Sequence, residues 1–192
     1  EWEPLAKDGN AKAQYNLGYM YDSGEGVPLN YEAAVKWYSL AAKQGDDFAQ
    51  YRLDVLHYKG DGVLRDYKTA TKWLELAAEQ GYTSAQSNFG FIINNESPLP
   101  KNYRTAMKWY RLAAERGYGF AHYNLGLMYS RGDGVIRDDV YAHMWWNLAA
   151  SQEDKQAAKV RDIVSEKMTP SQIAEAQKLA RECLKKKYKG CD

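Results

Sequence analysis

Apolar side chains recur three and four residues apart along most of the chain, in segments that glycine-rich breaks separate. This spacing places them on one face of an α-helix, so residues 11–22 are predicted to be helical. The segment Gly24–Pro28 then interrupts the pattern. A second helix is expected from Asn30, whose side chain suits an N-cap, to near Gly45. Because no stretch alternates between apolar and polar residues for long enough to form a strand, the pattern predicts an all-α chain.

The helix pairs repeat at a fixed interval of 36 residues without an insertion. A tryptophan marks the second helix of each copy and is expected to be largely buried between units. These repeat-core residues are Trp37, Trp73, Trp109 and Trp145. A period fixed to the residue predicts identical units stacked in a single solenoid over 1–192. The expected parts are the remnant of an earlier helix at 1–9, repeats at 10–45, 46–81, 82–117 and 118–153, and capping helices at 154–192.

The copies AQYNLGYMYDSGEGVPLNYEAAVKWYSLAAKQG at 13–45 and AHYNLGLMYSRGDGVIRDDVYAHMWWNLAASQE at 121–153 resemble the Sel-1-like repeat, a relative of the tetratricopeptide repeat. The resemblance implies a right-handed superhelical α-solenoid of stacked helix-turn-helix repeats, whose first helices line a concave surface. Bacterial members act as adaptors, which implies that this chain binds a protein or peptide. In the third copy Asn95–Pro100 replace the glycine-rich turn, so a different turn geometry is expected over 94–100.

Composition and charge narrow the function further. The chain has 192 residues, of which 45% are apolar and 27% charged, as expected of a globular protein. Its 26 basic and 25 acidic residues give a net charge of +1, which argues against nucleic acid binding. No apolar run approaches the roughly 20 residues that span a bilayer, so membrane insertion is not expected. We expect a monomer that binds another protein.

Common motifs of enzymes are missing from the sequence. It has no P-loop, no H-E-x-x-H and no G-x-S-x-G. The three histidines, His57, His122 and His143, occupy different places in the repeat with no cysteine near, so neither a metal site nor a cofactor is expected. A cysteine-rich branch of the family is linked to β-lactam hydrolysis, which leaves a cell-wall or β-lactam-acting enzyme as the alternative. The serine β-lactamase motifs S-x-x-K and K-T-G are absent, and no catalytic residue is predicted.

Glycine recurs at one place inside the first helices, as Gly18, Gly90 and Gly126. Because glycine costs a helix ~1 kcal/mol relative to alanine, its recurrence predicts a close approach of two helices. Asp54 occupies the equivalent place in the second copy. Either the two helices separate there and the carboxylate reaches solvent or a partner, or Asp54 is a specificity residue.

Positions that differ between copies while sharing one face of the first helices are the candidate recognition surface. They recur at i, i+4, i+7 and i+11, which forms a stripe of aromatic, amide and cationic side chains. By the resemblance, this stripe would lie on the concave surface. The alternative is that these positions are simply unconstrained. The predicted partner-binding residues are Asn16, Tyr19, Arg52, Val55, Asn88, Phe91, Asn124, Leu127 and Arg131.

Both cysteines, Cys183 and Cys191, lie near the C-terminus. Along a continuous helix their Cα atoms would be ~12 Å apart, beyond the ~7 Å that a disulfide allows. A bridge therefore requires the helix to end between them, and Lys189-Gly190 offers that break. The C-x7-C spacing also resembles the bridge of the cysteine-rich branch. The alternative is two free thiols; a bridge would indicate a periplasmic or secreted bacterial protein.

Overall fold

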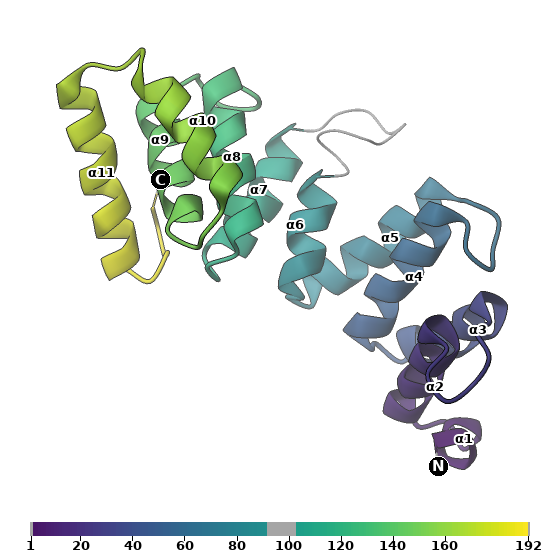
Figure 1. Ribbon diagram of the computed structural model, residues 1–192. Coiled ribbons are helices and arrows are strands. Elements are labelled where there is room, and N and C mark those ends of the chain that lie inside the picture. The colour runs from purple at the N-terminus through teal and green to yellow at the C-terminus, as the bar shows by residue number, and fades with distance from the viewer. Residues whose placement is uncertain (1, 92–102, 192) are drawn as a thin grey trace. The chain divides into compact units, whose positions relative to one another are not determined.

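The computed structural model describes residues 2–91 and 103–191 of the chain (Figure 1). Within these ranges the chain forms helices and no strand, which confirms the predicted all-α repeat fold. The turn at 94–100, for which the sequence predicts a different geometry, lies outside the described residues. The helices are α1 (Trp2–Lys7), α2 (Ala11–Ser23), α3 (Tyr31–Lys43), α4 (Asp47–Lys59), α5 (Tyr67–Glu79), α6 (Thr83–Phe91), α7 (Tyr103–Ala114), α8 (Gly119–Arg131), α9 (Asp139–Ala150), α10 (Lys155–Ser165) and α11 (Pro170–Lys185).

The chain divides into two compact units, Glu1–Phe89 and Gly90–Asp192. In the first unit α2 packs against α3 and α4 against α5, while α1 packs on α2 and α3 on α4. In the second unit α8 packs against α7 and α9, and both α10 and α11 contact α9. Each repeat therefore consists of one first helix (α2, α4, α6 or α8) and one second helix (α3, α5, α7 or α9). A second helix also contacts the first helix that follows it.

Side-chain caps determine where the second helices begin. The Asn30 side chain accepts a hydrogen bond from the backbone N–H of Ala33 at the start of α3. Asp66 and Asp138 accept the corresponding bonds at the starts of α5 and α9. These bonds satisfy N–H groups that have no partner inside the helix. The cap that the sequence predicts at Asn30 is confirmed, and Asp66 and Asp138 cap at the equivalent positions. The equivalent residue of the third copy, Asn102, lies outside the described residues.

A buried polar side chain ties each first helix to the end of the preceding second helix. It contacts a backbone carbonyl in the last turn of that helix, where carbonyl groups have no N–H partner within the helix. The same position therefore links one repeat to the next along the whole array. The side-chain nitrogens of Gln14, Gln50, Gln86 and His122 lie 3.0, 3.2, 3.0 and 3.1 Å from the carbonyl oxygens of Ala6, Ala42, Ala78 and Ala114.

Within a repeat, the two helices approach closely at the recurring glycine. A Cβ atom on Gly126 would lie 2.4 Å from Nε1 of Trp146, far inside van der Waals contact. Only glycine therefore fits beneath the ring, and the predicted close approach is confirmed. The pairs in contact are Gly18–Tyr38, Gly90–Tyr110 and Gly126–Trp146.

The repeated tryptophans are not equally buried. Trp109 and Trp145 are 6% and 2% exposed. Trp37 and Trp73 are only half-buried, so the expectation of uniform burial is corrected for these two. Each packs against the buried cluster formed by its own first helix and the preceding second helix. The fully buried position is one residue further on, where Tyr38 of the first repeat is 0% exposed.

We expect Gly126→Ala to lower the free energy of unfolding by about 1–2 kcal/mol. Overpacking against an aromatic ring costs about 1–3 kcal/mol, which exceeds the ~1 kcal/mol that alanine adds to helix stability. The ring of Trp146 cannot move aside cheaply, because its Nε1 donates a hydrogen bond to the backbone oxygen of Tyr123 at 3.1 Å. Urea unfolding followed by circular dichroism measures the loss.

A double-mutant cycle with Trp146→Leu isolates the contact. In that background Gly126→Ala should be neutral or stabilising, because the ring that opposes the methyl group is gone. Equal losses in both backgrounds would show that the glycine is required for a reason other than this contact.

Candidate interaction surface on the first helices

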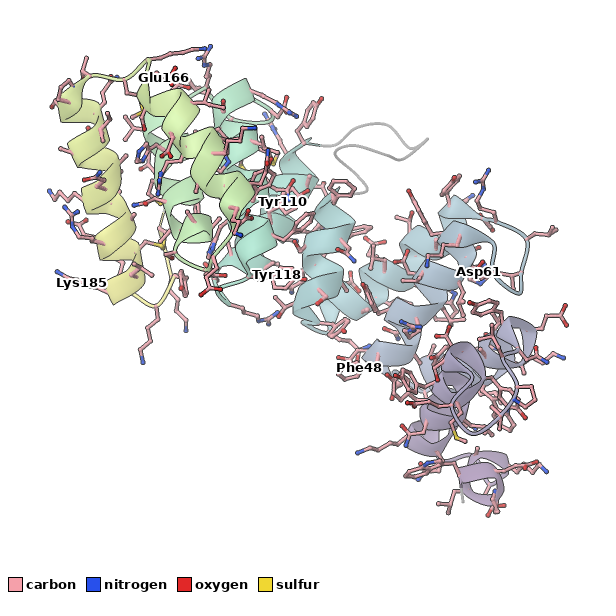
Figure 2. All side chains as sticks on the ribbon, in the orientation of Figure 1. Phe48, Asp61, Tyr110, Tyr118, Glu166 and Lys185 are labelled. Carbon is pink, nitrogen blue, oxygen red and sulfur yellow. A yellow bond between two sulfur atoms is a disulfide. The ribbon has the colours of Figure 1, made fainter. Side chains whose placement is uncertain are left out.

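Aromatic rings from successive first helices form a continuous row in the first unit. The ring of Tyr15 in α2 lies 5.9 Å from that of Phe48 in α4, and Phe48 lies 4.9 Å from Tyr82, just before α6. Tyr51, one turn beyond Phe48 on α4, lies 5.2 Å from Tyr82. We call these four residues the aromatic row. Phe48 projects from the start of α4 (Figure 2) and remains 48% exposed.

The predicted stripe residues of the first unit border this row. Tyr19 is 42% exposed. Asn88 is half-buried, and its Nδ2 donates a hydrogen bond to the hydroxyl of Tyr51 at 3.0 Å. Asn16, Arg52 and Val55 are also half-buried. The i, i+4, i+7, i+11 series did not predict the aromatic row, because three of its rings lie outside the series: Tyr15, Tyr51 and Tyr82. Phe48 lies at the first position of the series in the second copy but is not among the predicted partner-binding residues.

Arg52 is engaged in a polar cluster that joins the first two repeats. Its Nε donates to Oδ2 of Asp22 at 2.9 Å and its Nη2 also contacts that oxygen, while the Tyr38 hydroxyl donates to it at 3.0 Å. Burial raises the pKa of Tyr38, and the charge of Asp22 adds to that rise. Burial alone would lower the pKa of Arg52. The hydrogen bond to Asp22 and the charge of Asp22 have the larger combined effect, so the pKa of Arg52 is raised. Arg52 is therefore a structural residue as well as a candidate contact.

The stripe residues of the second unit form a separate and smaller patch. The rings of Phe91 and Phe120 lie 5.8 Å apart, and Phe120 is 40% exposed. Leu127 is half-buried and Arg131 is exposed. Asn124 is 2% exposed, and its Nδ2 donates to the Phe120 carbonyl oxygen at 2.8 Å. The prediction that Asn124 offers a contact to a partner is corrected, because its side chain is buried and bonded to its own helix.

Asp54 is buried rather than directed to solvent. Its residue is 4% exposed, and its Oδ1 has no hydrogen-bond partner. Burial raises the pKa of Asp54 to about 7. In the second helix of this repeat, Leu74 stands where the other repeats have a ring. A smaller side chain therefore replaces the ring in the repeat whose first helix carries Asp54 in place of glycine, and the interpretation that this carboxylate reaches solvent is wrong.

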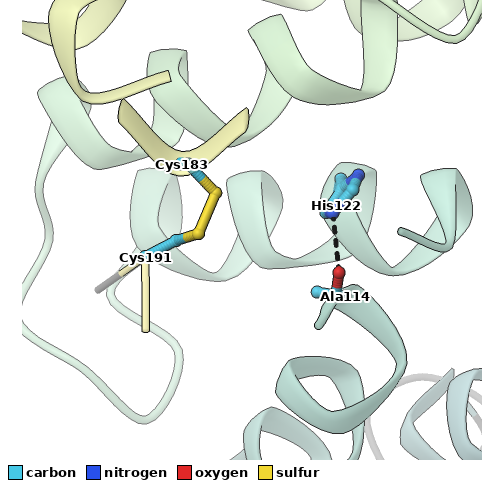
Figure 3. Close-up of a disulfide and its surroundings, with 4 residues drawn as sticks. All are labelled: Ala114, His122, Cys183 and Cys191. Carbon is cyan, nitrogen blue, oxygen red and sulfur yellow. Dashed lines mark hydrogen bonds between the residues drawn. A yellow bond between two sulfur atoms is a disulfide. The ribbon is translucent and has the colours of Figure 1, made fainter. Parts of the chain in front are cut away.

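The C-terminal cysteines are joined by a disulfide bond that holds the tail against the fourth repeat (Figure 3). The Cα atoms of Cys183 and Cys191 are 5.1 Å apart, because α11 ends at Lys185 before the chain turns back. Tyr188, inside the closed loop, lies with its ring 5.1 Å from that of His122. Burial lowers the pKa of His122 to about 4, and its hydrogen bond to the Ala114 carbonyl opposes this shift.

Among residues 2–91 and 103–191, no group of three or more His, Cys, Asp or Glu side chains could hold a metal ion. In the same ranges, no helix is both long enough and apolar enough to cross a membrane.

Comparisons with known proteins identify the repeat. The family model described as Sel1 repeat matches four times, at 11–46, 47–82, 83–118 and 119–154. The structure is similar to that of a protective antigen of uropathogenic Escherichia coli with an SLR fold, at 34% identity and a TM-score of 0.86 over 99% of this chain and 41% of that one. It is also similar to a Sel1 repeat protein from Oxalobacter formigenes, at 34% identity and a TM-score of 0.73 over 94% of this chain and 67% of that one. The chain thus spans less than half of the first structure. A search of curated proteins gave no match.

The raised pKa of Asp54 predicts that stability depends on pH. Between the ordinary value of 3.8 and about 7, the folded protein binds more protons than the unfolded chain. The free energy of unfolding should therefore fall as the pH rises through this range, by a few kcal/mol at most, and level off above it. Asp54→Asn should remove this slope, and Asp8→Asn, which changes an exposed carboxylate of the same unit, should keep it. Urea unfolding at pH 4.5 and 8 measures both; an unchanged slope in Asp54→Asn would contradict the assignment.

Reduction of the disulfide should release Tyr188 and expose His122. The pKa of His122 should then rise from about 4 towards its ordinary value, because burial is what lowers it. Histidine NMR titrations of the oxidised protein and of Cys191→Ser measure this rise, with His57 of the other unit as the internal reference. Thiol titration of the unfolded, unreduced protein is the prior check, since two reactive thiols would rule out the bridge.

Proposed function

Because the chain belongs to the Sel1 repeat family, whose members are commonly protein-interaction scaffolds, we propose that it is an adaptor that binds a protein segment on its first helices. The observation that carries this proposal is the aromatic row, whose Phe48 ring is 48% exposed at its middle. Aromatic rings supply large contact areas at low cost in side-chain entropy, which suits them to binding surfaces. We do not propose catalysis.

An extended segment fits the row better than a compact ligand does. The ring centroids from Tyr15 through Phe48 to Tyr82 are separated by 5.9 and 4.9 Å, which together match about three residues of extended chain at ~3.3 Å each. Tyr19 and Asn88 border the row, so apolar and hydrogen-bonding groups lie side by side. In the second unit, Phe91 and Phe120 with Leu127 and Arg131 would bind a further part of the partner.

We also make proposals for the localisation and the domain organisation of the protein. A disulfide bond persists in oxidising compartments, and the two similar structures are bacterial proteins, so we propose a periplasmic or secreted bacterial protein. We further propose that residues 1–192 form a single monomeric solenoid, with α1 as the remnant of an earlier repeat and residues 154–192 as its cap. The cysteine-rich enzyme branch remains the alternative function.

Selection of peptides from a random phage library on the immobilised protein tests this proposal. Replacing Phe48 and Tyr19 by Ser should weaken the selected peptides at least about tenfold, or ~1.4 kcal/mol, because aromatic anchors dominate such interfaces. Leu64→Ser is the matched control, since Leu64 is an apolar residue of the same unit that is 92% exposed in a turn away from the row.

Circular dichroism should show equal helicity for both variants and the unaltered protein. Peptides that bind the Phe48/Tyr19 variant as tightly as the original would refute the proposed surface. A nitrocefin hydrolysis assay separates the enzyme alternative, since measurable turnover would contradict a purely adaptor function.

A further inference from the structure

The second helices carry a groove on the face that the proposed first-helix surface does not use. In the second unit it is a cavity of about 410 Å³ between α7 and the turn that joins α8 to α9. Its apolar part is formed by Met107, Leu112 and Val135. Arg104 and Lys108 line it as exposed side chains, and Arg111 also contributes. We call this cavity the outer groove.

The groove arises from the repeat itself rather than from an irregularity of α7. A cavity of about 320 Å³ lies on α5 in the first unit, lined by Thr69, Lys72, Trp73 and Leu76. Lys72 and Leu76 are the equivalents of Lys108 and Leu112, 36 residues earlier. Two repeats therefore present the same kind of hollow, and their side chains can be compared position by position.

Charge distinguishes the groove on α7 from its equivalents. Its three basic positions, Arg104, Lys108 and Arg111, follow at i, i+4 and i+7 and lie along one side of the helix. The corresponding triplets are Glu32, Lys36 and Ser39 in the first repeat, Lys68, Lys72 and Glu75 in the second, and Val140, Met144 and Asn147 in the fourth. The fold thus does not require three cations here. Glu115, at the end of α7, is the one acidic side chain among the described lining residues.

The cations are positioned along the edge of an apolar floor. Lys108 holds its Nζ 5.4 Å from the centre of the Trp109 ring, and Arg111 donates from Nη2 to the Tyr129 hydroxyl at 3.3 Å. Met107 beneath them is 3% exposed. Four residues of helix separate Arg104 from Lys108, a rise of ~6 Å, which two residues of extended peptide also span. Because alternate residues of an extended peptide share one face, acidic side chains two residues apart would face these two cations.

We propose that the outer groove on α7 binds an acidic peptide segment of a protein partner, with carboxylates on Arg104 and Lys108 and an aliphatic side chain on the Met107–Leu112–Val135 floor. This surface is independent of the aromatic row, because it lies on a second helix and in the second unit. Charge complementarity selects the partner's acidic residues, and the floor requires that they flank an apolar residue.

Fluorescence anisotropy with a labelled twelve-residue peptide of repeated Glu-Glu-Leu tests the proposal on the full chain. Arg104→Glu with Lys108→Glu should weaken binding at least about tenfold. Lys68→Glu with Lys72→Glu makes the identical change of charge at the equivalent positions of the second repeat and should change binding less than about twofold. Equal weakening by both variants would show only diffuse attraction and would overturn the proposal.

Peptide changes test the two halves of the recognition separately. Replacing every Leu of the peptide by Ser, or every Glu by Gln, should each reduce affinity severalfold; an unaffected affinity overturns the corresponding half. Arg104→Gln with Lys108→Gln repeats the test without introducing negative charge, in case the Glu variant unfolds. Tighter binding of a twelve-base-pair DNA or of phosphatidylserine vesicles, lost in the same variant, would replace the acidic peptide by another ligand and overturn the proposal.

Discussion

The packing of an aromatic ring on a glycine sets the distance between the two helices of a repeat. With the ring of Tyr38, Tyr110 or Trp146 lodged on the partner helix, the remaining faces of both helices are fixed in direction. In the first repeat the first helix then directs Tyr19 outward, and in the third repeat the second helix directs Lys108 to a different surface. Both candidate binding surfaces therefore include residues whose direction this internal contact sets. A solenoid of such units buries a continuous core while leaving each outer face free to vary.

The second repeat keeps the register but lacks this contact, because it has neither the glycine nor the ring. Leu74 leaves room that the other rings fill, and Asp54 places a carboxylate in that region instead. A buried carboxylate whose Oδ1 has no hydrogen-bond partner is costly when ionised, and burial raises the pKa of Asp54 to about 7. Because each unit of a solenoid supports its neighbours, we expect the protonation of Asp54 to affect the stability of α4, which carries two rings of the aromatic row. Variation between the copies of the repeat thus changes the buried packing as well as the surface.

The 36-residue period predicted the helices and their caps well, because local signals such as Asn30, Asp66 and the glycine-rich turns determine them. The period predicted the burial of side chains less well, because burial depends on the neighbouring repeat against which each helix packs. Trp37 is half-buried while Trp145 is buried, although the two occupy the same place in the period. The aromatic row could not be found from one copy, because Tyr15, Phe48 and Tyr82 come together only when helices from successive repeats pack. Asn124 likewise looked exposed by position but bonds to its own helix.

Repetition also explains how one chain can carry two recognition chemistries without conflict. Arg104 and Lys108 are exposed, so the cation that stands in place of Glu32 in the third copy leaves the core unchanged. Arg111, which stands in place of Glu75, donates a hydrogen bond to Tyr129 of the fourth repeat. The cost of concentrating Arg104, Lys108 and Arg111 is mutual repulsion, which is small for exposed groups in water and is lowered further by nearby Glu115. A ligand carboxylate would relieve that repulsion. A cluster of like charges that occurs in one copy, on a fold that does not need it, is therefore a better guide to binding than a charge that recurs in every copy.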